Sequence, residues 1–249
     1  MKIDFHGQTV LVTGATRGIG KQVADDFANL GASLILTGTD TKQVESLNEG
    51  ALHSNALKKY FVADFSDKQS TEIFLDEIGR YNRIDVCVNN AGINRINYID
   101  ETLVEDFEDI MAVNLHAPFM ITRVVSRIMK RNGYGRIVNI SSIFGVISKE
   151  KRSVYSISKF GLHGLTVSSA NELARHNVLV NTVSPGFVKT DLTERILGPE
   201  EMAALATQVP LGRFAEPAEI ARIVLFLASS LNTYIAGQNI IADGGFVNV

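Results

Sequence analysis

Short apolar runs alternate with longer amphipathic segments along the chain. The short runs, of four to six residues and rich in β-branched side chains, are predicted as strands at 9–13, 33–37, 59–63, 85–89, 136–140, 178–183 and 239–242. Most of them are almost continuously apolar, which is typical of strands that are buried on both faces of a parallel sheet.

The segments between the runs have helical periodicity. In 18–30, Ile19, Val23, Phe27 and Leu30 recur at helical spacing, and further helices are predicted at 67–81, 103–131, 155–175 and 217–228. Alternation of strands and helices with short connections predicts an α/β fold, a doubly wound seven-stranded parallel sheet with helices on both faces. Because no linker or internal repeat interrupts it, we interpret 1–249 as a single domain.

One segment fits this pattern less well. The stretch 187–212 is long and mixed, and its apolar residues indicate either a mobile lid over a substrate or a rigid helical pair that belongs to the core. These residues are Leu192, Ile196, Leu197, Met202 and Leu205.

Composition narrows the function classes. The 249 residues carry a net charge of −3, which gives no electrostatic footprint for nucleic acid. No apolar run is long enough for a membrane helix, and the first residues do not resemble a secretion signal. The single cysteine, Cys87, lies within a predicted strand and is expected to be a small core residue. These features predict a cytoplasmic enzyme, and no metal site is predicted.

A glycine-rich loop follows the first predicted strand. Gly14 permits a tight turn, Gly18 lets the backbone approach a pyrophosphate, and Gly20 allows close packing of helix against strand. The start of the next helix offers free N–H groups to phosphates. A plain turn is the alternative for such glycines, but the strand before and the helix after favour a dinucleotide site in a Rossmann fold.

The end of the second strand indicates which dinucleotide is bound. An acidic residue there would bind the ribose 2′-hydroxyl of NAD(H), but this position is Gly38. Arg17 is placed to pair with a 2′-phosphate, so NADP(H) is favoured over NAD(H). A solvated loop charge is the alternative for Arg17, and Thr39 and Asp40 argue in the other direction.

Tyr155 and Lys159 are four residues apart and therefore share one face of a helix. A neighbouring ammonium stabilises a phenolate and lowers the tyrosine pKa, so Tyr155 is a candidate acid–base group. Ser142 follows a predicted strand and is a candidate to hold a reacting carbonyl oxygen. Asn114, a polar residue in an apolar helix, indicates a backbone kink with a bound water. The alternatives are a surface tyrosine, a capping serine and a core asparagine bonded to backbone.

With these residues in order, the whole chain resembles the short-chain dehydrogenase/reductase family. The motifs that carry the resemblance are 13–20, Asp64, 89–92, Asn114, Ser142, Tyr155 to Lys159, and Pro185 with Gly186. The resemblance implies hydride transfer between a nicotinamide and a carbonyl carbon, with Tyr155 transferring the proton. It implies a catalytic tetrad of Asn114, Ser142, Tyr155 and Lys159.

The same resemblance implies the cofactor contacts. Asp64 is expected to hold the adenine amine, Asn90 and Ala91 to flank the adenine ribose, and 185–190 to hold the nicotinamide amide and a phosphate. The complete expected set is Gly14, Thr16, Arg17, Gly18, Ile19, Gly20, Thr37, Gly38, Thr39, Asp64, Phe65, Asn90, Ala91, Gly92, Tyr155, Lys159, Pro185, Gly186, Val188 and Thr190. The expected substrate contacts are Ser142, Phe144, Ile147, Tyr155 and Phe187, although the three apolar residues would equally suit core packing.

Longer stretches resemble the beta-ketoacyl-ACP reductase branch of the family, including 89–95, 135–145, 177–193, 208–229 and 234–245. This favours an NADPH-dependent reductase of a 3-oxoacyl thioester. A dehydrogenase of a sugar, sugar nucleotide or other small alcohol is the first alternative, and a catalytically silent dinucleotide-binding protein is the second. The charged residues 149–152 depart from that branch and indicate either an anionic substrate or a solvated loop.

The resemblance also concerns partners. The substrate is expected to be a small carbonyl or alcohol, attached to acyl carrier protein or CoA in the favoured hypothesis. An acidic carrier needs a basic dock, and the candidates near the active-site rim are Lys130, Arg131, Arg136 and Arg175. A homotetramer is expected, through 103–131, 155–175 and the C-terminal strand.

Overall fold

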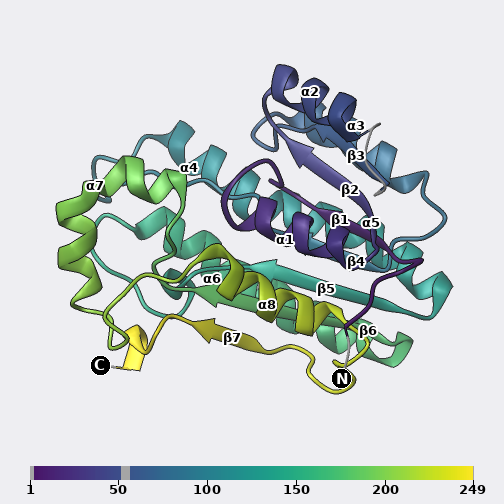
Figure 1. Cartoon of the computed structure of the whole chain (residues 1–249). Coiled ribbons are helices and arrows are strands. Elements are labelled where there is room, and N and C mark those ends of the chain that lie inside the picture. Colours follow the sequence, from purple (N-terminus) through teal and green to yellow (C-terminus); the bar gives the residue numbers. More distant parts are fainter. Residues whose placement is uncertain (1–2, 52–56, 249) are drawn as a thin grey trace.

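In residues 3–51 and 57–248, which the computed structural model describes, seven parallel strands form one sheet in the order β3-β2-β1-β4-β5-β6-β7 (Figure 1). The strands are β1 (Thr9–Val12), β2 (Ser33–Gly38), β3 (Lys58–Val62), β4 (Val86–Asn89), β5 (Gly135–Ile140), β6 (Val178–Pro185) and β7 (Asn239–Ala242). All the predicted strands are confirmed, and no strand end differs from its expected position by more than two residues.

The helices differ from the prediction in three places. The helices are α1 (Gly18–Asn29), α2 (Thr41–Ala51), α3 (Lys68–Gly79), α4 (Val104–Met111), α5 (Ala117–Asn132), α6 (Ser153–Leu173), α7 (Asp191–Ala206) and α8 (Pro217–Ala228). Helix α2 was not predicted, because its one buried residue, Val44, leaves almost no apolar periodicity. The single helix expected at 103–131 is divided by a π-helical turn, Ala112–His116, and the stretch 187–212 contains α7.

Successive residues of the central strands point to opposite faces of the sheet, as strand geometry requires. Val10 and Val12 of β1 pack with Phe27 of α1 and Val224 of α8, whereas Leu11 packs on the other face with residues of α3, α5 and α6. Two buried apolar layers result, one on each face, and Cys87 lies in the second as expected.

The strand order places a crevice at the carboxyl ends of the strands. The chain forms β1, β2 and β3 outward in one direction and then crosses to β4, on the other side of β1. Ligands bind where the strand order reverses in this way, outside the carboxyl ends of the strands. Figure 1 shows α4 and α7 beyond the arrowheads of the strands, on either side of this edge.

Candidate active site

A cavity of about 380 Å³ lies at the carboxyl ends of β1, β2 and β4. Most of the predicted cofactor residues line it: Gly14, Thr16, Arg17, Gly18, Ile19, Gly20, Thr37, Gly38, Thr39, Asp64, Phe65, Asn90, Ala91, Gly92 and Thr190. The structure therefore brings these residues together around one cavity, and their contact with a cofactor stays a prediction. Gln43, Ala63, Ile93 and Val113 also line it and were not predicted.

The glycine loop has the geometry of a phosphate cradle. Gly14 and Gly18 have φ values of 62° and 53°, a region that favours glycine. A Cβ atom at Gly20 would collide with the carbonyl oxygen of Gly14 and the amide of Asn90, so the helix can pack this closely only through a glycine. No side chain caps the start of α1 among the described contacts, so its first N–H groups remain available to an anion.

Asn90 has a structural task that the sequence analysis missed. Its Nδ2 donates to the carbonyl oxygens of Thr13 and Gly14, at 2.9 and 3.0 Å, while the backbone N–H of Gly14 donates to Thr37 Oγ1 at 3.0 Å. The start of the loop is thereby fixed to β4 on one side and β2 on the other. Such fixed backbone geometry is what close approach to a pyrophosphate needs.

The side chains expected near the 2′ position of the adenine ribose lie at the wall of this cavity. Arg17 and Thr39 are exposed at the wall of the cavity, next to Gly38. Asp40 also lines the wall, but its Oδ1 accepts a hydrogen bond from the backbone N–H of Gln43 at 2.9 Å, which caps α2. The carboxylate that weakened the NADP(H) prediction is therefore engaged at the start of a helix.

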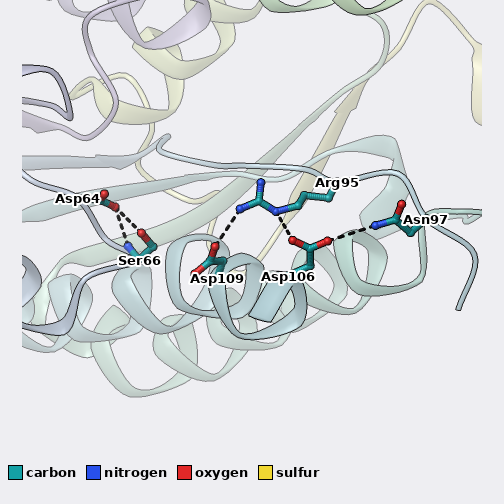
Figure 2. Close-up of polar contacts among 6 residues, drawn as sticks. All are labelled: Asp64, Ser66, Arg95, Asn97, Asp106 and Asp109. Carbon is teal, nitrogen blue, oxygen red and sulfur yellow. Dashed lines mark hydrogen bonds and ion pairs between the residues drawn. The ribbon is translucent and has the colours of Figure 1, made fainter. Parts of the chain in front are cut away.

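Asp64 lies at the opposite wall, where Figure 2 shows its contact with Ser66. Its Oδ1 accepts from the backbone N–H and from the hydroxyl of Ser66, at 2.9 and 2.7 Å. These bonds fix the orientation of the carboxylate. The other carboxylate oxygen has no hydrogen bond among the described residues, so it remains available to accept one from an adenine amine.

A second cavity, of about 340 Å³, adjoins the first, since Asn90, Gly92 and Thr190 line both. It contains the remaining predicted residues, which are Ser142, Phe144, Tyr155, Lys159, Pro185, Gly186, Phe187 and Val188. Ile147 is half-buried and is not among the residues that line this cavity, so its contact with substrate stays a prediction. Its backbone N–H donates to the carbonyl oxygen of Ile143 at 2.9 Å.

Ser142 and Tyr155 face each other in this cavity. Ser142 follows β5 and starts a 3-10 turn, Ile143–Gly145, in which its Oγ accepts from the N–H of Phe144 at 3.2 Å. Burial raises the pKa of the Tyr155 hydroxyl, whereas a hydrogen bond from Ser142 and the positive charge of Arg152 act to lower it. The sequence analysis expected Lys159 to lower this pKa. In the structure the cation that does so is Arg152, and burial outweighs it.

Lys159 is only 3% exposed, and its Nζ donates to the carbonyl oxygen of Ile140 at 2.9 Å. Burial without a carboxylate partner lowers the pKa of this ammonium group to about 8. Nζ lies 5.6 Å from the centre of the Tyr155 ring, so the two side chains meet as their spacing on α6 predicts.

Asn114 is fully buried within the π-helical turn between α4 and α5. The predicted irregularity of the helix is thus present. Its amide bonds to the backbone of Ile93 in both directions, at 2.8 and 2.9 Å, and donates to Ser158 Oγ at 3.1 Å. Both Asn114 Oδ1 and Lys159 Nζ adjoin Gly92, so Asn114 ties the loop after β4 to α6 beside Lys159.

Comparisons with known proteins agree with this geometry. Residues 14–247 match the family model described as Enoyl-(Acyl carrier protein) reductase. The 3-oxoacyl-(acyl-carrier-protein) reductase FabG of Aquifex aeolicus (strain VF5) is 40% identical over 247 residues, 98% of this chain and 99% of its own. The chain belongs to the short-chain dehydrogenase/reductase family.

Two solved structures of similar proteins show the same fold. One, described as a putative NAD(P)-dependent gluconate 5-dehydrogenase from Beutenbergia cavernae with bound NADP at low occupancy, is 31% identical with a TM-score of 0.90 and covers 99% of each chain. Another, described as a putative betaketoacyl-ACP reductase, is 32% identical with a TM-score of 0.87, and covers 98% of this chain and 100% of its own. The proteins similar to this chain thus include enzymes named for two substrate classes, gluconate and beta-ketoacyl groups on a carrier protein.

The sequence analysis missed part of the wall of the second cavity. Asn94, Ile96, Lys149 and Arg152 come from the loops after β4 and β5, and Thr193, Leu197, Glu201 and Leu205 come from α7. Loop residues carry no periodicity that would reveal them. Two signals were present in the sequence, the charged run 149–152 and the apolar residues of 187–212, which include Leu197 and Leu205, and each left two interpretations open.

The loop after β4 is held in place by ion pairs (Figure 2). Arg95 Nε pairs with Asp106 at 2.5 Å and its Nη2 with Asp109 at 2.9 Å, both on α4. Asn97 donates to the second oxygen of Asp106 at 3.2 Å. The loop carries Asn94 and Ile96, so these contacts fix one wall of the cavity to α4.

The basic dock predicted at the active-site rim is wrong in its position. Lys130 and Arg131 lie at the end of α5, just before β5 begins, and Arg175 lies just before β6. These are the amino ends of parallel strands, at the edge of the sheet opposite the crevice. Arg136 is 3% exposed and donates to the carbonyl oxygens of Gly135, Asn177 and Asn232, so it is a structural residue within the subunit.

Within residues 3–51 and 57–248, no helix is both long and apolar enough to cross a membrane.

Proposed function

We propose that this chain is an NADPH-dependent reductase that converts a ketone to a secondary alcohol, with a 3-oxoacyl thioester as its substrate. One observation carries the proposal: Ser142, Tyr155 and Lys159 line a single cavity that adjoins the cavity of the glycine loop. A silent dinucleotide-binding protein has no chemical need for this set of residues.

When bound, the nicotinamide supplies the hydride to the carbonyl carbon. Gly14, Gly18 and the start of α1 hold the phosphates, and Arg17 selects the 2′-phosphate of NADPH. Pro185, Gly186 and Val188 line the second cavity and would hold the nicotinamide there. The protein contributes position and proton transfer.

Ser142 and Tyr155 act on the oxygen of the substrate carbonyl. The hydroxyl of Ser142 donates a hydrogen bond to it and holds it beside the phenol. Tyr155, whose raised pKa keeps it protonated at neutral pH, donates its proton to this oxygen as negative charge develops. Lys159, with a pKa of about 8, supplies positive charge and a replacement proton from the next turn of α6.

The substrate class is supported by the relatives. The Aquifex protein is named for the reduction of 3-oxoacyl groups on a carrier protein and aligns along almost the whole chain. Apolar walls from Phe144, Phe187 and Leu197 suit an acyl chain. A polyol or sugar acid is the second candidate, because the Beutenbergia structure is described as a gluconate 5-dehydrogenase.

We also infer a homotetramer, formed through the helices that the sequence analysis named. Large apolar side chains are exposed along α4, α5 and α6, among them Phe107, Phe119, Ile157, Phe160 and Val167. Such patches mark protein contacts. Sedimentation of a stable monomer would contradict this. The single domain and the cytoplasmic location stay predictions. The closing motion of 187–212 stays a prediction too, and the break in α7 at Gly198 would serve as its hinge. The side chains of Leu192 and Ile196 lie outside the described residues.

The test is NADPH oxidation with an acetoacetyl thioester, with Tyr155→Phe and an exposed control, Tyr98→Phe, in parallel. We expect turnover that falls ~100-fold or more in Tyr155→Phe and is unchanged in the control. NADPH binding to Tyr155→Phe, followed by fluorescence, should persist. If this variant keeps its activity, the proposed mechanism is wrong; if only gluconate-type substrates turn over, the second candidate replaces the first.

A further inference from the structure

Arg152 brings a cation with free donors to the wall of the second cavity. It precedes α6 and lines the cavity beside Tyr155 and Phe144. Its Nε and Nη1 are buried, and neither has a hydrogen-bond partner among the described residues. Buried charged donors are costly unless they are paired, so an arginine in this state calls for a ligand.

The position of the guanidinium is set by neighbouring aromatic rings. Its central carbon lies 5.4 Å from the centre of the Phe144 ring, a cation–π contact. Tyr155 packs on the same ring, edge to face, with 6.4 Å between ring centres. Burial raises the pKa of the Tyr155 hydroxyl, and the positive charge of Arg152 acts in the opposite direction. Arg152 and Tyr155 thus contact the same aromatic ring, that of Phe144.

The other residues of the charged run are placed differently. Lys151 turns away, with a φ of 62°, and its ammonium lies over the ring of Tyr98, 4.4 Å from its centre. Glu150 is exposed and Lys149 is exposed at the cavity wall. The two interpretations of this run therefore apply to different members: Arg152 belongs to the cavity, and Lys151 does not.

We propose that Arg152 is an anion-binding residue of the substrate cavity, and that ketones with a carboxylate within a few bonds of the reacting carbon are a further substrate class of this site, beside the 3-oxoacyl thioester. This rests on the proposed function, because Tyr155 defines where the ketone lies. The donors of Arg152 that lack a partner can form charge-assisted hydrogen bonds with the oxygens of a carboxylate. Glu201 lies in the same cavity wall and adds negative charge, which favours a singly charged carboxylate over a phosphate dianion.

The test compares acetoacetate with its neutral methyl ester as substrates of the NADPH-loaded enzyme. The two ketones share a skeleton and differ in charge. We expect kcat/KM to be at least tenfold higher for acetoacetate, and this ratio to fall about tenfold in Arg152→Gln, chiefly through KM. Arg152→Lys, which keeps the charge without the fork of donors, should give an intermediate ratio. Lys151→Gln is the matched control and should leave the ratio unchanged.

Binding gives a readout that does not need turnover. Line broadening in proton NMR spectra should show butyrate, but not butyramide, binding to the NADPH-loaded wild type, and Arg152→Gln should abolish it. Arg152→Met retains the apolar contact with Phe144, so its folding, followed by circular dichroism, serves as the structural control.

The failures are distinguishable. Equal ratios in the wild type and Arg152→Gln, or butyrate binding that survives the substitution, would overturn the role of Arg152 while leaving ketone reduction intact. Tighter binding of inorganic phosphate than of butyrate would overturn the carboxylate assignment. Loss of the proposed function instead would show as no Tyr155-dependent reduction of any ketone, including the acetoacetyl thioester.

Discussion

The ammonium nitrogen of Lys159 lies 5.6 Å from the centre of the Tyr155 ring and donates to the carbonyl oxygen of Ile140. No carboxylate in the described part of the chain forms an ion pair with it. The lysine therefore bears the cost of burial itself, and its pKa is lowered to about 8. The phenol remains protonated over the same pH range because burial raises its pKa. The group that titrates near neutrality at this site is the lysine and not the tyrosine.

The rate of ketone reduction should therefore fall as the pH rises through about 8, where the ammonium group loses its proton. Lys159 supplies charge and a proton in its protonated form, so the deprotonated enzyme is the less active one for reduction. We expect this decrease in kcat, measured between pH 6 and pH 10 in steps of ~1 pH unit. Lys159→Arg should lose the decrease, since arginine stays charged, whereas Lys151→Arg should retain it. A decrease that persists in Lys159→Arg would assign the titration to another group.

The same burial should make Lys159 a destabilising residue. Its folded pKa of about 8 lies below the ordinary value of 10.5, so the unfolded chain binds more protons between these values. The contribution of Lys159 to stability thus rises with pH across this window, and below pH 8 the full penalty applies, ~3 kcal/mol from the shift. Lys159→Met removes the charge and loses one hydrogen bond to Ile140.

We expect Lys159→Met to be inactive and yet to raise the free energy of unfolding at pH 7 by about 1–2 kcal/mol. Denaturation by urea measures this. Lys151→Met, a partly exposed position, should change it by less than ~0.5 kcal/mol. A Lys159→Met variant less stable than the wild type would show that the hydrogen bond to Ile140 outweighs the burial of charge.

The cofactor preference depends on Arg17, the exposed cation beside Gly38. Arg17→Gln should raise KM for NADPH ~10-fold and leave KM for NADH within about twofold, because a charge-assisted bond to the 2′-phosphate is lost and nothing else changes. The effect should shrink at high salt, which screens exposed charges. Lys21→Gln makes the same charge change one turn along α1, where the lysine pairs with Asp25, and serves as the control. Parallel rises for both cofactors in Arg17→Gln would remove the basis for the NADP(H) preference.

The sequence revealed what periodicity and short motifs can encode. Buried strands have continuous apolar runs, so the sheet was predictable. The glycine loop and the Tyr155–Lys159 spacing are local patterns, so the residues that the structure brings together around the two cavities could be named as candidates. Helix α2 was not predictable, because Val44 is its one buried residue and Leu47 is only partly buried, which is too little apolar periodicity to predict a helix. The π-helical turn at Asn114 was visible only as one polar residue out of pattern.

Long-range geometry was the part that the sequence could not supply. The end of α5 and the active site both carry basic residues, but only the parallel topology shows that Lys130 and Arg131 lie at the opposite edge of the sheet. Likewise, four consecutive residues at 149–152 read as a single charged loop. A positive φ at Lys151 separates them, sending Lys151 to Tyr98 and Arg152 into the cavity.

Gly20 gives the sharpest test of the loop geometry. A Cβ atom there would meet the carbonyl oxygen of Gly14 and the amide of Asn90, the two groups whose hydrogen bond fixes the loop. Gly20→Ala should therefore weaken NADPH binding ~10-fold or more and lower the free energy of unfolding by about 1–3 kcal/mol. Gly50→Ala is the matched control, also at a glycine within a helix, and a Cβ atom at Gly50 meets nothing within 4 Å among the described residues. There the gain in helix propensity should stabilise the protein by ~0.5–1 kcal/mol with NADPH affinity unchanged. Fluorescence titration and urea denaturation of both variants decide the matter, and a Gly20→Ala protein that binds NADPH normally would mean that the loop has room to shift.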